Sequence, residues 1–330
     1  MEKVWDDLRF FPDRIIRKSA VLTIGNFDGL HKGHMTLLRK TDLMAKSMEN
    51  EGKQPEVIRV MLTFSPHPQE LISGSGKGFE RLFSDEEKLD MAEESGLLDE
   101  VILLNFTPEV MHMEPEAFFR EILIERYRAC GIVVGENFRF GDRGRGTAGF
   151  LKEMCLRENI PCCVIPDVYD VQDDPREGKC ISSTRIKELL TEGDVRRAAD
   201  LLGRPYFIRG EVQEGKHVGT EMDTPTLNIF PAPGQMLPRW GVYVSRTHIG
   251  EESYRSITNV GGNPTFGGED PRSETFVFDF SGCLYGKTVR VELLEFIRPE
   301  QHFDSVDALK QQLTKDINTA SAYFPAESGD

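Results

Sequence analysis

The stretch VLTIGNFDGLHKGHMTLLR, residues 21–39, decides the fold of the first half of the chain. It opens with a short apolar run of strand length, breaks at Gly25 and resumes as an amphipathic run near Gly33. This pattern predicts a strand, a glycine turn and a helix. A helix that begins just after a glycine turn presents unpaired backbone N–H groups and the positive end of its dipole, which suits a polyphosphate.

Two histidines, His31 and His34, stand at the start of the predicted helix, three residues apart. Residues at this spacing can face the same way, so both imidazoles can reach one anion beside the helix N-terminus. Gly33 between them leaves room for close approach. The alternative interpretation is that the two histidines are ordinary packed or exposed side chains that bind no anion. A zinc site of the metalloprotease kind is not favoured, because it needs histidines four residues apart with a glutamate between them.

Length and composition predict a two-domain globular protein. The 330 residues exceed the size at which one hydrophobic core usually stops growing, and 39% hydrophobic with 29% charged residues is ordinary for such a protein. No apolar run approaches the length needed to span a bilayer, so we expect a cytoplasmic protein without a membrane partner. The net charge of −15 argues against a nucleic-acid partner, although a small pocket can still bind anionic nucleotides. A homo-oligomer is possible.

Runs typical of strands and helices alternate through the first half of the chain. The segments 57–64, 99–106 and 131–141 have the composition of strands, and helical runs separate them. One of these helices opens with a capping box formed by Ser84 and Glu87. This alternation predicts an α/β domain with a mostly parallel, Rossmann-like sheet. His67, between two prolines, follows the 57–64 strand, where open α/β sheets keep their ligands.

The pattern changes after Gly203 and Pro205, which end a short helical run. From Tyr206 onward, short alternating runs punctuated by glycine and proline predict an antiparallel barrel or sandwich. The amphipathic segment 305–324 predicts a last helix that packs across it. We therefore expect one domain over residues 1–190 and a second over residues 191–330.

The segment GNFDGLHKGH, residues 25–34, resembles the G-x-F-D-x-x-H-x-G-H signature of nucleotidyltransferases. With the rest of the chain, the resemblance narrows to the prokaryotic bifunctional riboflavin kinase and FMN adenylyltransferase family, also called FAD synthetases. It covers nearly the whole chain and implies a nucleotidyltransferase domain followed by a riboflavin kinase β-barrel with a C-terminal helix. It implies phosphorylation of riboflavin to FMN and adenylylation of FMN to FAD with release of pyrophosphate. ATP and Mg²⁺ would serve both reactions.

The resemblance also assigns residues to the adenylyltransferase site. His31 and His34 would be catalytic and donate to phosphate oxygens. Asn137 carries over from the family's G-x-[DN]-F-x-F-G segment. The segment ISSTRIK resembles I-S-S-T-x-[IV]-R, with Lys187 in place of the arginine fork. The nucleotide-binding residues implied for this domain are Gly25, Asn26, Phe27, Asp28, Gly33, Asn137, Ser183, Thr184 and Lys187.

In the second domain, the segment DTPTLNI resembles the P-T-A-N motif of riboflavin kinases. Thr226 and Asn228 carry over as nucleotide-binding residues and ligands of Mg²⁺, which prefers oxygen donors. Glu274 aligns with the family's catalytic glutamate. The segment NVGGNPTFG resembles the flavin-side loop, and its flavin-binding residues would be Asn259, Pro264, Thr265 and Phe266.

The kinase half departs from the family pattern at Thr220, which replaces an arginine, and at Asp223, which replaces a glycine. The first change removes a phosphate-pairing charge, and the second brings a negative charge toward ATP. An alternative hypothesis is therefore an FMN adenylyltransferase whose decayed kinase half serves as a flavin-binding or regulatory module. A transferase acting on another acceptor, such as a cytidylyltransferase, is a further alternative, but it would not need the barrel.

Overall fold

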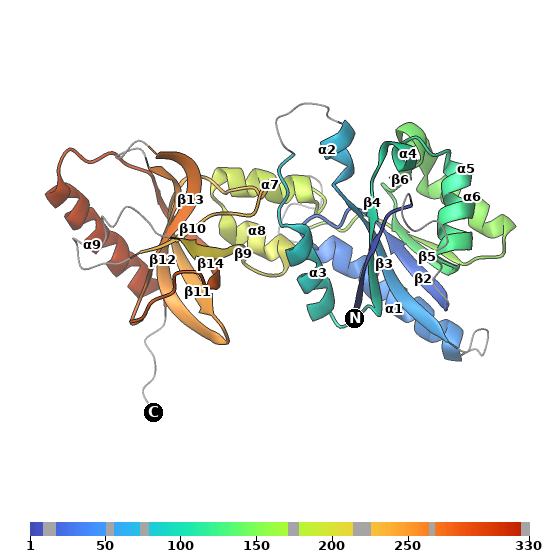
Figure 1. Ribbon diagram of the computed structural model, residues 1–330, viewed down its shortest axis with the longest axis horizontal. Coiled ribbons are helices and arrows are strands. Elements are labelled where there is room, and N and C mark those ends of the chain that lie inside the picture. Colours follow the sequence, from blue (N-terminus) through green and yellow to red (C-terminus); the bar gives the residue numbers. More distant parts are fainter. Residues whose placement is uncertain are drawn as a thin grey trace. The chain divides into compact units, whose positions relative to one another are not determined.

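The computed structural model describes residues 1–8, 18–50, 56–72, 79–170, 178–213, 226–263 and 268–324. The chain divides into two compact units (Figure 1). The N-terminal unit comprises Met1–Phe79 and Phe83–Ser182, and the C-terminal unit comprises Glu80–Leu82 and Ser183–Asp330.

The N-terminal unit is built on a six-stranded sheet in which every pair of neighbouring strands is parallel. In spatial order the strands are β1 (Glu2–Asp6), β4 (Glu100–Asn105), β3 (Val57–Ser65), β2 (Ser19–Ile24), β5 (Ala129–Gly135) and β8 (Cys162–Ile165). The predicted Rossmann-like parallel sheet is confirmed. Helices connect successive strands, as parallel pairing requires.

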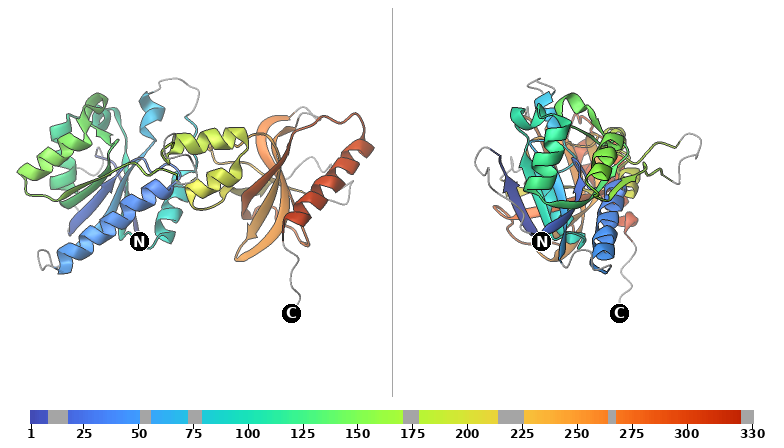
Figure 2. Two further views of the ribbon diagram at one scale, coloured as in Figure 1. Left: turned by 180° about the vertical axis from the view of Figure 1, so that it is seen from behind. Right: turned by 90° about the vertical axis from the view of Figure 1, so that its right-hand side faces the viewer.

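Helices cover both faces of this sheet. The helical segments are α1 (Lys32–Asn50), α2 (Pro68–Ile72), α3 (Asp85–Glu94), α4 (Pro108–Met111), α5 (Pro115–Ala117), the π-helical η1 (Phe118–Arg126), the short 3-10 turn η2 (Asp142–Gly144) and α6 (Ala148–Arg157). Helix α1 packs on one face, where a Cβ on Gly131 would lie 2.8 Å from Met44 Sδ. It crosses the sheet in the left view of Figure 2. On the other face, Leu22 packs in one core with Phe118 and Leu151.

Local signals in the sequence agree with most element ends. Ser84 and Glu87 form the predicted capping box at the start of α3. One strand is shorter than expected: the segment 131–141 is not one strand, because the chain turns after Gly135, where the N–H of Phe138 donates to the Gly135 carbonyl at 3.1 Å. The short hairpin strands β6 (Arg139–Phe140) and β7 (Gly146–Thr147) follow that turn.

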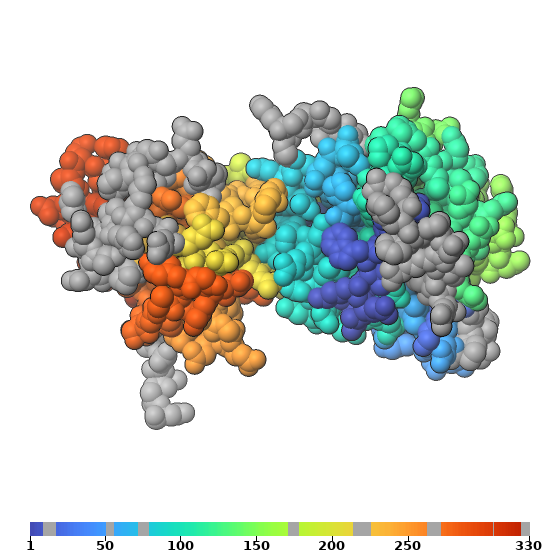
Figure 3. All heavy atoms as spheres, in the orientation of Figure 1, coloured from blue at the N-terminus to red at the C-terminus, as the bar shows by residue number. Residues whose placement is uncertain are grey.

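Strand β1 was not predicted from the sequence. Of its five residues only Val4 and Asp6 are buried, while Trp5 is 57% exposed. Such an edge strand carries too little apolar signal to stand out. In Figure 3 its dark blue atoms form part of the visible surface of the N-terminal unit.

The C-terminal unit is a closed antiparallel barrel that begins after the helix pair α7 (Ser183–Glu192) and α8 (Val195–Leu202). Around the barrel the strands are β10 (Leu227–Ile229), β13 (Gly268–Val277), β12 (Glu252–Asn263), β11 (Gly241–Ile249), β14 (Thr288–Pro299) and β9 (Tyr206–Gln213). Of the two predicted architectures, barrel and sandwich, the structure has the barrel. Helix α7 belongs to this unit, where the N–H of Arg239 donates to the Leu190 carbonyl at 2.8 Å.

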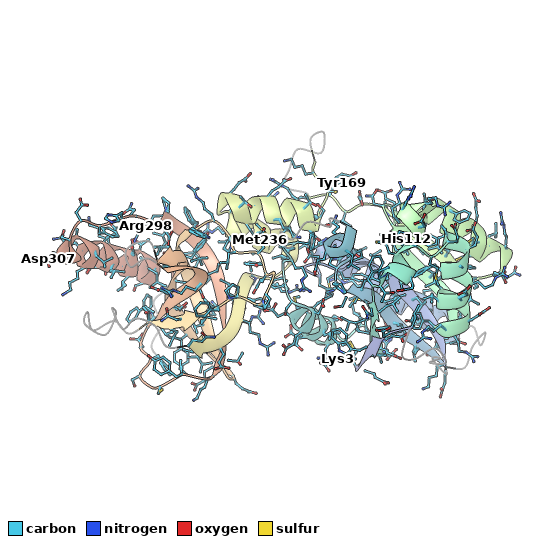
Figure 4. The ribbon with its side chains drawn as sticks, turned by 45° about the horizontal axis from the view of Figure 1, so that its top comes forward. Lys3, His112, Tyr169, Met236, Arg298 and Asp307 are labelled. Atoms are coloured by element: carbon cyan, nitrogen blue, oxygen red, sulfur yellow. The ribbon has the colours of Figure 1, made fainter. Side chains whose placement is uncertain are left out.

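Helix α9 (Val306–Tyr323) packs across the outer face of the barrel, as the sequence predicts. Ala320 of this helix lies in one core with Val244 and Ile257 of the barrel strands. Arg298, which Figure 4 labels close to this helix, makes an ion pair with Asp316 of α9 at 2.7 Å. The barrel interior is more polar, since the buried hydroxyls of Ser245, Ser256, Thr258 and Thr275 bond to one another.

Candidate active sites

The order of strands in the parallel sheet locates a ligand site. From β2 the chain adds β3 and β4 on one side, and it then returns to the other side of β2 as β5. In open α/β sheets, ligands bind at the carboxyl ends of the strands where the order reverses in this way. The turn at residues 25–31 follows β2, and Asn137 follows β5, so both predicted segments begin at this edge.

The turn after β2 holds its residues in an unusual backbone conformation. Phe27 and Leu30 have φ angles of 51° and 41°, which residues with side chains seldom adopt. The Phe27 side chain is fully buried and meets the His34 ring edge-on, with 5.2 Å between the ring centres. The Phe27 ring therefore supports His34 from behind. Asp28 is also buried, whereas Asn26 is exposed.

His31 and His34 lie against each other, as their spacing predicts. Their rings stack with centres 3.6 Å apart, and the backbone N–H of His34 donates to His31 Nδ1 at 3.4 Å. A Cβ on Gly33 would lie 3.1 Å from the His31 ring, so the space that Gly33 leaves is occupied by that ring. Helix α1 begins at Lys32, which puts both histidines at the positive end of its dipole.

His34 is held in its neutral form. Burial lowers its pKa well below the ordinary value of 6.5, and the nearby His31 and Lys88 lower it further. Its Nδ1 is buried and has no hydrogen-bond partner among the described residues. A neutral imidazole carries one N–H, so His34 can donate one hydrogen bond from one ring nitrogen and accept one at the other.

The other predicted nucleotide-binding residues lie in two places. Asn137 is exposed and donates to Asp167 Oδ2 at 2.6 Å, just beyond β8. Ser183 and Thr184 lie in the first turn of α7, in the C-terminal unit. Lys187 on the same helix donates to the Glu80 carbonyl at 2.6 Å.

The proline-flanked His67 lies at the end of β3, as predicted. Its side chain is buried, and its ring stacks on Phe79 with centres 4.2 Å apart. The backbone N–H of Gln69 donates to His67 Nδ1 at 3.2 Å. These contacts hold the His67 ring in one orientation.

In the barrel, strand register brings three predicted residues together. Glu274 of β13 lies opposite Asn228 of β10 on one side and opposite Asn259 of β12 on the other. Residues two apart in a strand share a face, so Asn259 lies on the same outer face as Ile257, which packs near α9. A carboxylate flanked by two amides is thus assembled from three strands.

Two further residues complete this row, and the sequence interpretation missed both. Arg272 Nε donates to Glu274 Oε1 at 3.0 Å, two residues earlier on the same strand. Glu300, just beyond β14, lies against Gly261, where a Cβ would be 2.0 Å from Glu300 Oε1. Burial raises the pKa of Glu300, a hydrogen bond from Asn259 lowers it, and the charge of Glu274 raises it again. The period of a strand could have revealed Arg272, but no local pattern points to Glu300.

The donor set beside Glu274 fits Mg²⁺. Thr226 and Asn228 offer a hydroxyl and an amide oxygen at the start of β10, and Mg²⁺ prefers such oxygens together with water and nucleotide phosphates. Across the described residues, no group of three or more His, Cys, Asp or Glu side chains is arranged to hold a metal ion. Pro264, Thr265 and Phe266, and the departures at Thr220 and Asp223, lie outside the described residues.

Comparison with known proteins accounts for both units. The sequence profile of a family described as FAD synthetase matches residues 13–185, and that of riboflavin kinase matches residues 202–324. A bifunctional riboflavin kinase/FMN adenylyltransferase from Escherichia coli strain K12 is 32% identical over 309 residues, which cover 93% of this chain and 94% of that protein. The chain belongs to this bifunctional family.

A relative of the same description from Haemophilus influenzae is 31% identical over 310 residues, covering 94% of this chain and 96% of the relative. A crystal structure from Streptococcus pneumoniae, described as a macrolide-efflux protein, has a TM-score of 0.82 and 31% identity, and the match covers 96% of this chain and 99% of that one. In the part of this chain that the structure describes, no helix combines the length and apolar character needed to span a bilayer.

Proposed function

We propose that the C-terminal unit phosphorylates riboflavin to FMN and that the N-terminal unit adenylylates FMN to FAD, with ATP and Mg²⁺ in both reactions. The observation that best supports this proposal is that each unit contains its own group of candidate functional side chains. One is the stacked pair His31–His34 at a helix start, and the other is the row of Asn228, Glu274 and Asn259 across three strands. The first suits a polyphosphate and the second suits proton removal beside a flavin.

In adenylyl transfer, a phosphate oxygen of FMN attacks the α-phosphorus of ATP in line, and pyrophosphate leaves. The protein positions both reactants and stabilises the charge that develops on the leaving group. His31, His34 and the first N–H groups of α1 would donate to phosphate oxygens. The backbone of residues 25–28 would line the nucleotide site, Asn137 would contact the nucleotide, and Ser183, Thr184 and Lys187 would hold the pyrophosphate.

In phosphoryl transfer, the 5′-hydroxyl oxygen of riboflavin attacks the γ-phosphorus of ATP, the bond from that phosphorus to the bridging oxygen breaks, and ADP leaves. Glu274 accepts the hydroxyl proton. The Arg272 Nε–H, which donates to Glu274 Oε1 at 3.0 Å, holds the carboxylate in place for this role. Thr226 and Asn228 would hold Mg²⁺, which when bound neutralises charge on the phosphates. Asn259, with Pro264, Thr265 and Phe266, would contact the flavin.

The alternative of a decayed kinase half is less well supported, because the row around Glu274 is complete. The small-molecule partners of the bifunctional enzyme would be riboflavin, FMN and ATP. We place the enzyme in the cytoplasm, without membrane or nucleic-acid partners.

The proposal is tested by incubating the purified protein with riboflavin, ATP and Mg²⁺ and separating riboflavin, FMN and FAD by chromatography. We expect FMN to appear first and FAD to follow. FMN supplied in place of riboflavin tests the second reaction by itself. Flavin binding without FMN formation would favour the decayed kinase half, and FMN without FAD would contradict the assignment of the N-terminal unit.

A further inference from the structure

Lys88 on α3 is a buried charge that the proposed mechanism does not yet use. Its side chain is 5% exposed, and its Nζ lies 3.1 Å from Asp85 Oδ1 and 3.5 Å from Thr63 Oγ1. A buried ammonium group is costly unless it is paired, so this lysine needs a reason to be there.

Hydrogen bonds connect Lys88 to the turn that carries the histidines. Lys88 donates to Thr63 Oγ1, and the Thr63 hydroxyl donates to the Asn26 carbonyl at 3.1 Å. Asp85, the ion-pair partner of Lys88, also accepts a hydrogen bond from the Ser65 hydroxyl at 2.6 Å. Thr63 and Ser65 are at the end of β3, beside β2. Lys88 is therefore anchored at the carboxyl edge of the sheet, behind the turn.

The positive charge of Lys88 acts on His34. It is one of the groups that lower the pKa of His34, after burial and His31. The titratable groups that act on His34 are His31, which precedes helix α1, and Lys88 on α3, whose own ion-pair partner is Asp85. A charge in a buried position is screened less by salt and water than one on the surface.

We propose that Lys88 is a positioning residue of the adenylyl-transfer site, which holds the turn at residues 25–31 through Thr63 and supplies a fixed positive charge behind the phosphate-binding histidines. This inference rests on the proposed adenylylation in the N-terminal unit. Pre-organised positive charge stabilises the negative charge that grows on a leaving pyrophosphate. The same charge, together with burial and His31, disfavours protonation of His34.

The experiment compares Lys88→Met with the double variant Lys88→Met/Asp85→Asn, which removes both charges and leaves no carboxylate without its partner. Lys88→Arg keeps the charge, and Lys46→Met is the matched control, because it removes an exposed lysine paired with Asp42 in the same unit. The readouts are kcat and KM for FAD formation from supplied FMN, the NMR titration of His34 and the affinity for inorganic pyrophosphate.

We expect the single and double variants to lose about 10²-fold in kcat, as misplacement of a reacting group typically costs. Pyrophosphate should bind more weakly and the His34 pKa should rise in both. Lys88→Arg should retain the His34 titration, and Lys46→Met should match the parent. If the single variant does not fold, the double variant decides.

Recovery of the parent rate in the double variant would show that Lys88 only neutralises Asp85, and an unchanged His34 titration would show that its charge does not reach the site. Either result overturns the inference. If the parent itself makes no FAD, the proposed function fails, whereas the His34 titration and pyrophosphate binding still test Lys88.

Discussion

At the residue scale, His34 combines a binding role with a cost to stability. Its ring stacks on His31 and meets Phe27 edge-on, and its environment keeps it neutral. Because its pKa in the folded protein is far below that in the unfolded chain, the unfolded chain takes up a proton first as the pH falls. His34 therefore opposes folding below about pH 6.5, the ordinary histidine value, and contributes nothing above it.

We predict that His34→Gln flattens the pH dependence of stability of the N-terminal unit between pH 7 and pH 5. Glutamine stays neutral, so the unfolded chain gains no proton at this position. The free energy of unfolding can be followed by urea titration of the fluorescence of Trp5 in a Trp240→Phe background, since these are the two tryptophans of the chain. The same loss of stability toward pH 5 in both proteins would contradict the prediction.

Glu274 makes a second prediction at this scale. Glu274→Gln is nearly isosteric and removes the proton acceptor, so FMN formation should fall by about 10²- to 10⁴-fold. Supplied FMN should still become FAD, because that reaction is assigned to the other unit. Glu211→Gln, at an exposed position of β9, is the control. If Glu274→Gln forms FMN at the parent rate, Glu274 is structural and another base must be sought.

At the scale of elements, the register of β13 against β10 and β12 builds the proposed kinase site, and the small size of one glycine lets a further residue join it. Gly261 of β12 leaves space for Glu300, which follows β14. Glu300 in turn accepts a hydrogen bond from Asn259, the proposed flavin contact. The position of Asn259 on β12 thus depends on Glu300, which follows β14. Strands β12 and β14 are not neighbours in the barrel.

We predict that Gly261→Ala and Glu300→Gln each raise KM for riboflavin about fivefold, since one hydrogen bond is worth about 1 kcal/mol. The alanine methyl group would displace Glu300, and the glutamine would keep its shape but weaken the bond. The value of kcat should change less, because Glu274 remains in place. Steady-state kinetics of FMN formation measure both quantities. A fall in kcat with unchanged KM would assign Glu300 to the chemical step instead.

At the scale of the whole molecule, the two reactions are assigned to two separate units of one chain. The histidine turn belongs to the parallel sheet, and the Glu274 row belongs to the barrel. The histidine turn and the Glu274 row thus rest on different sheets, so damage to one need not reach the other.

We predict that His31→Ala/His34→Ala lowers FAD formation by about 10²-fold or more and leaves FMN formation nearly intact. Removing one donor to a developing negative charge typically costs that much. Chromatography of the flavins from riboflavin and ATP shows both rates in one experiment. His112→Ala, at an exposed histidine of the same unit, is the matched control. Unchanged FAD formation in the double variant would refute the site.

Much of the fold follows from the sequence by itself. The strand, turn and helix of residues 21–39, the capping box at Ser84 and the alternating runs of the barrel are local patterns, and the structure confirms each. They are readable because a strand or helix repeats its buried side within a few residues, and because turns and caps require particular side chains nearby. The roles of Asn228 and Glu274, however, rest on a resemblance to known enzymes and not on these patterns, whereas the spacing of His31 and His34 by itself already points to an anion.

Tertiary structure alone decided the rest. It added β1 to the edge of the sheet, put Lys88 behind the histidine turn and brought Glu300 to Asn259. None of these contacts joins neighbours in sequence, so no short window of the chain contains both partners. Register and burial depend on how whole strands and helices pack, and that packing chooses which distant side chains meet.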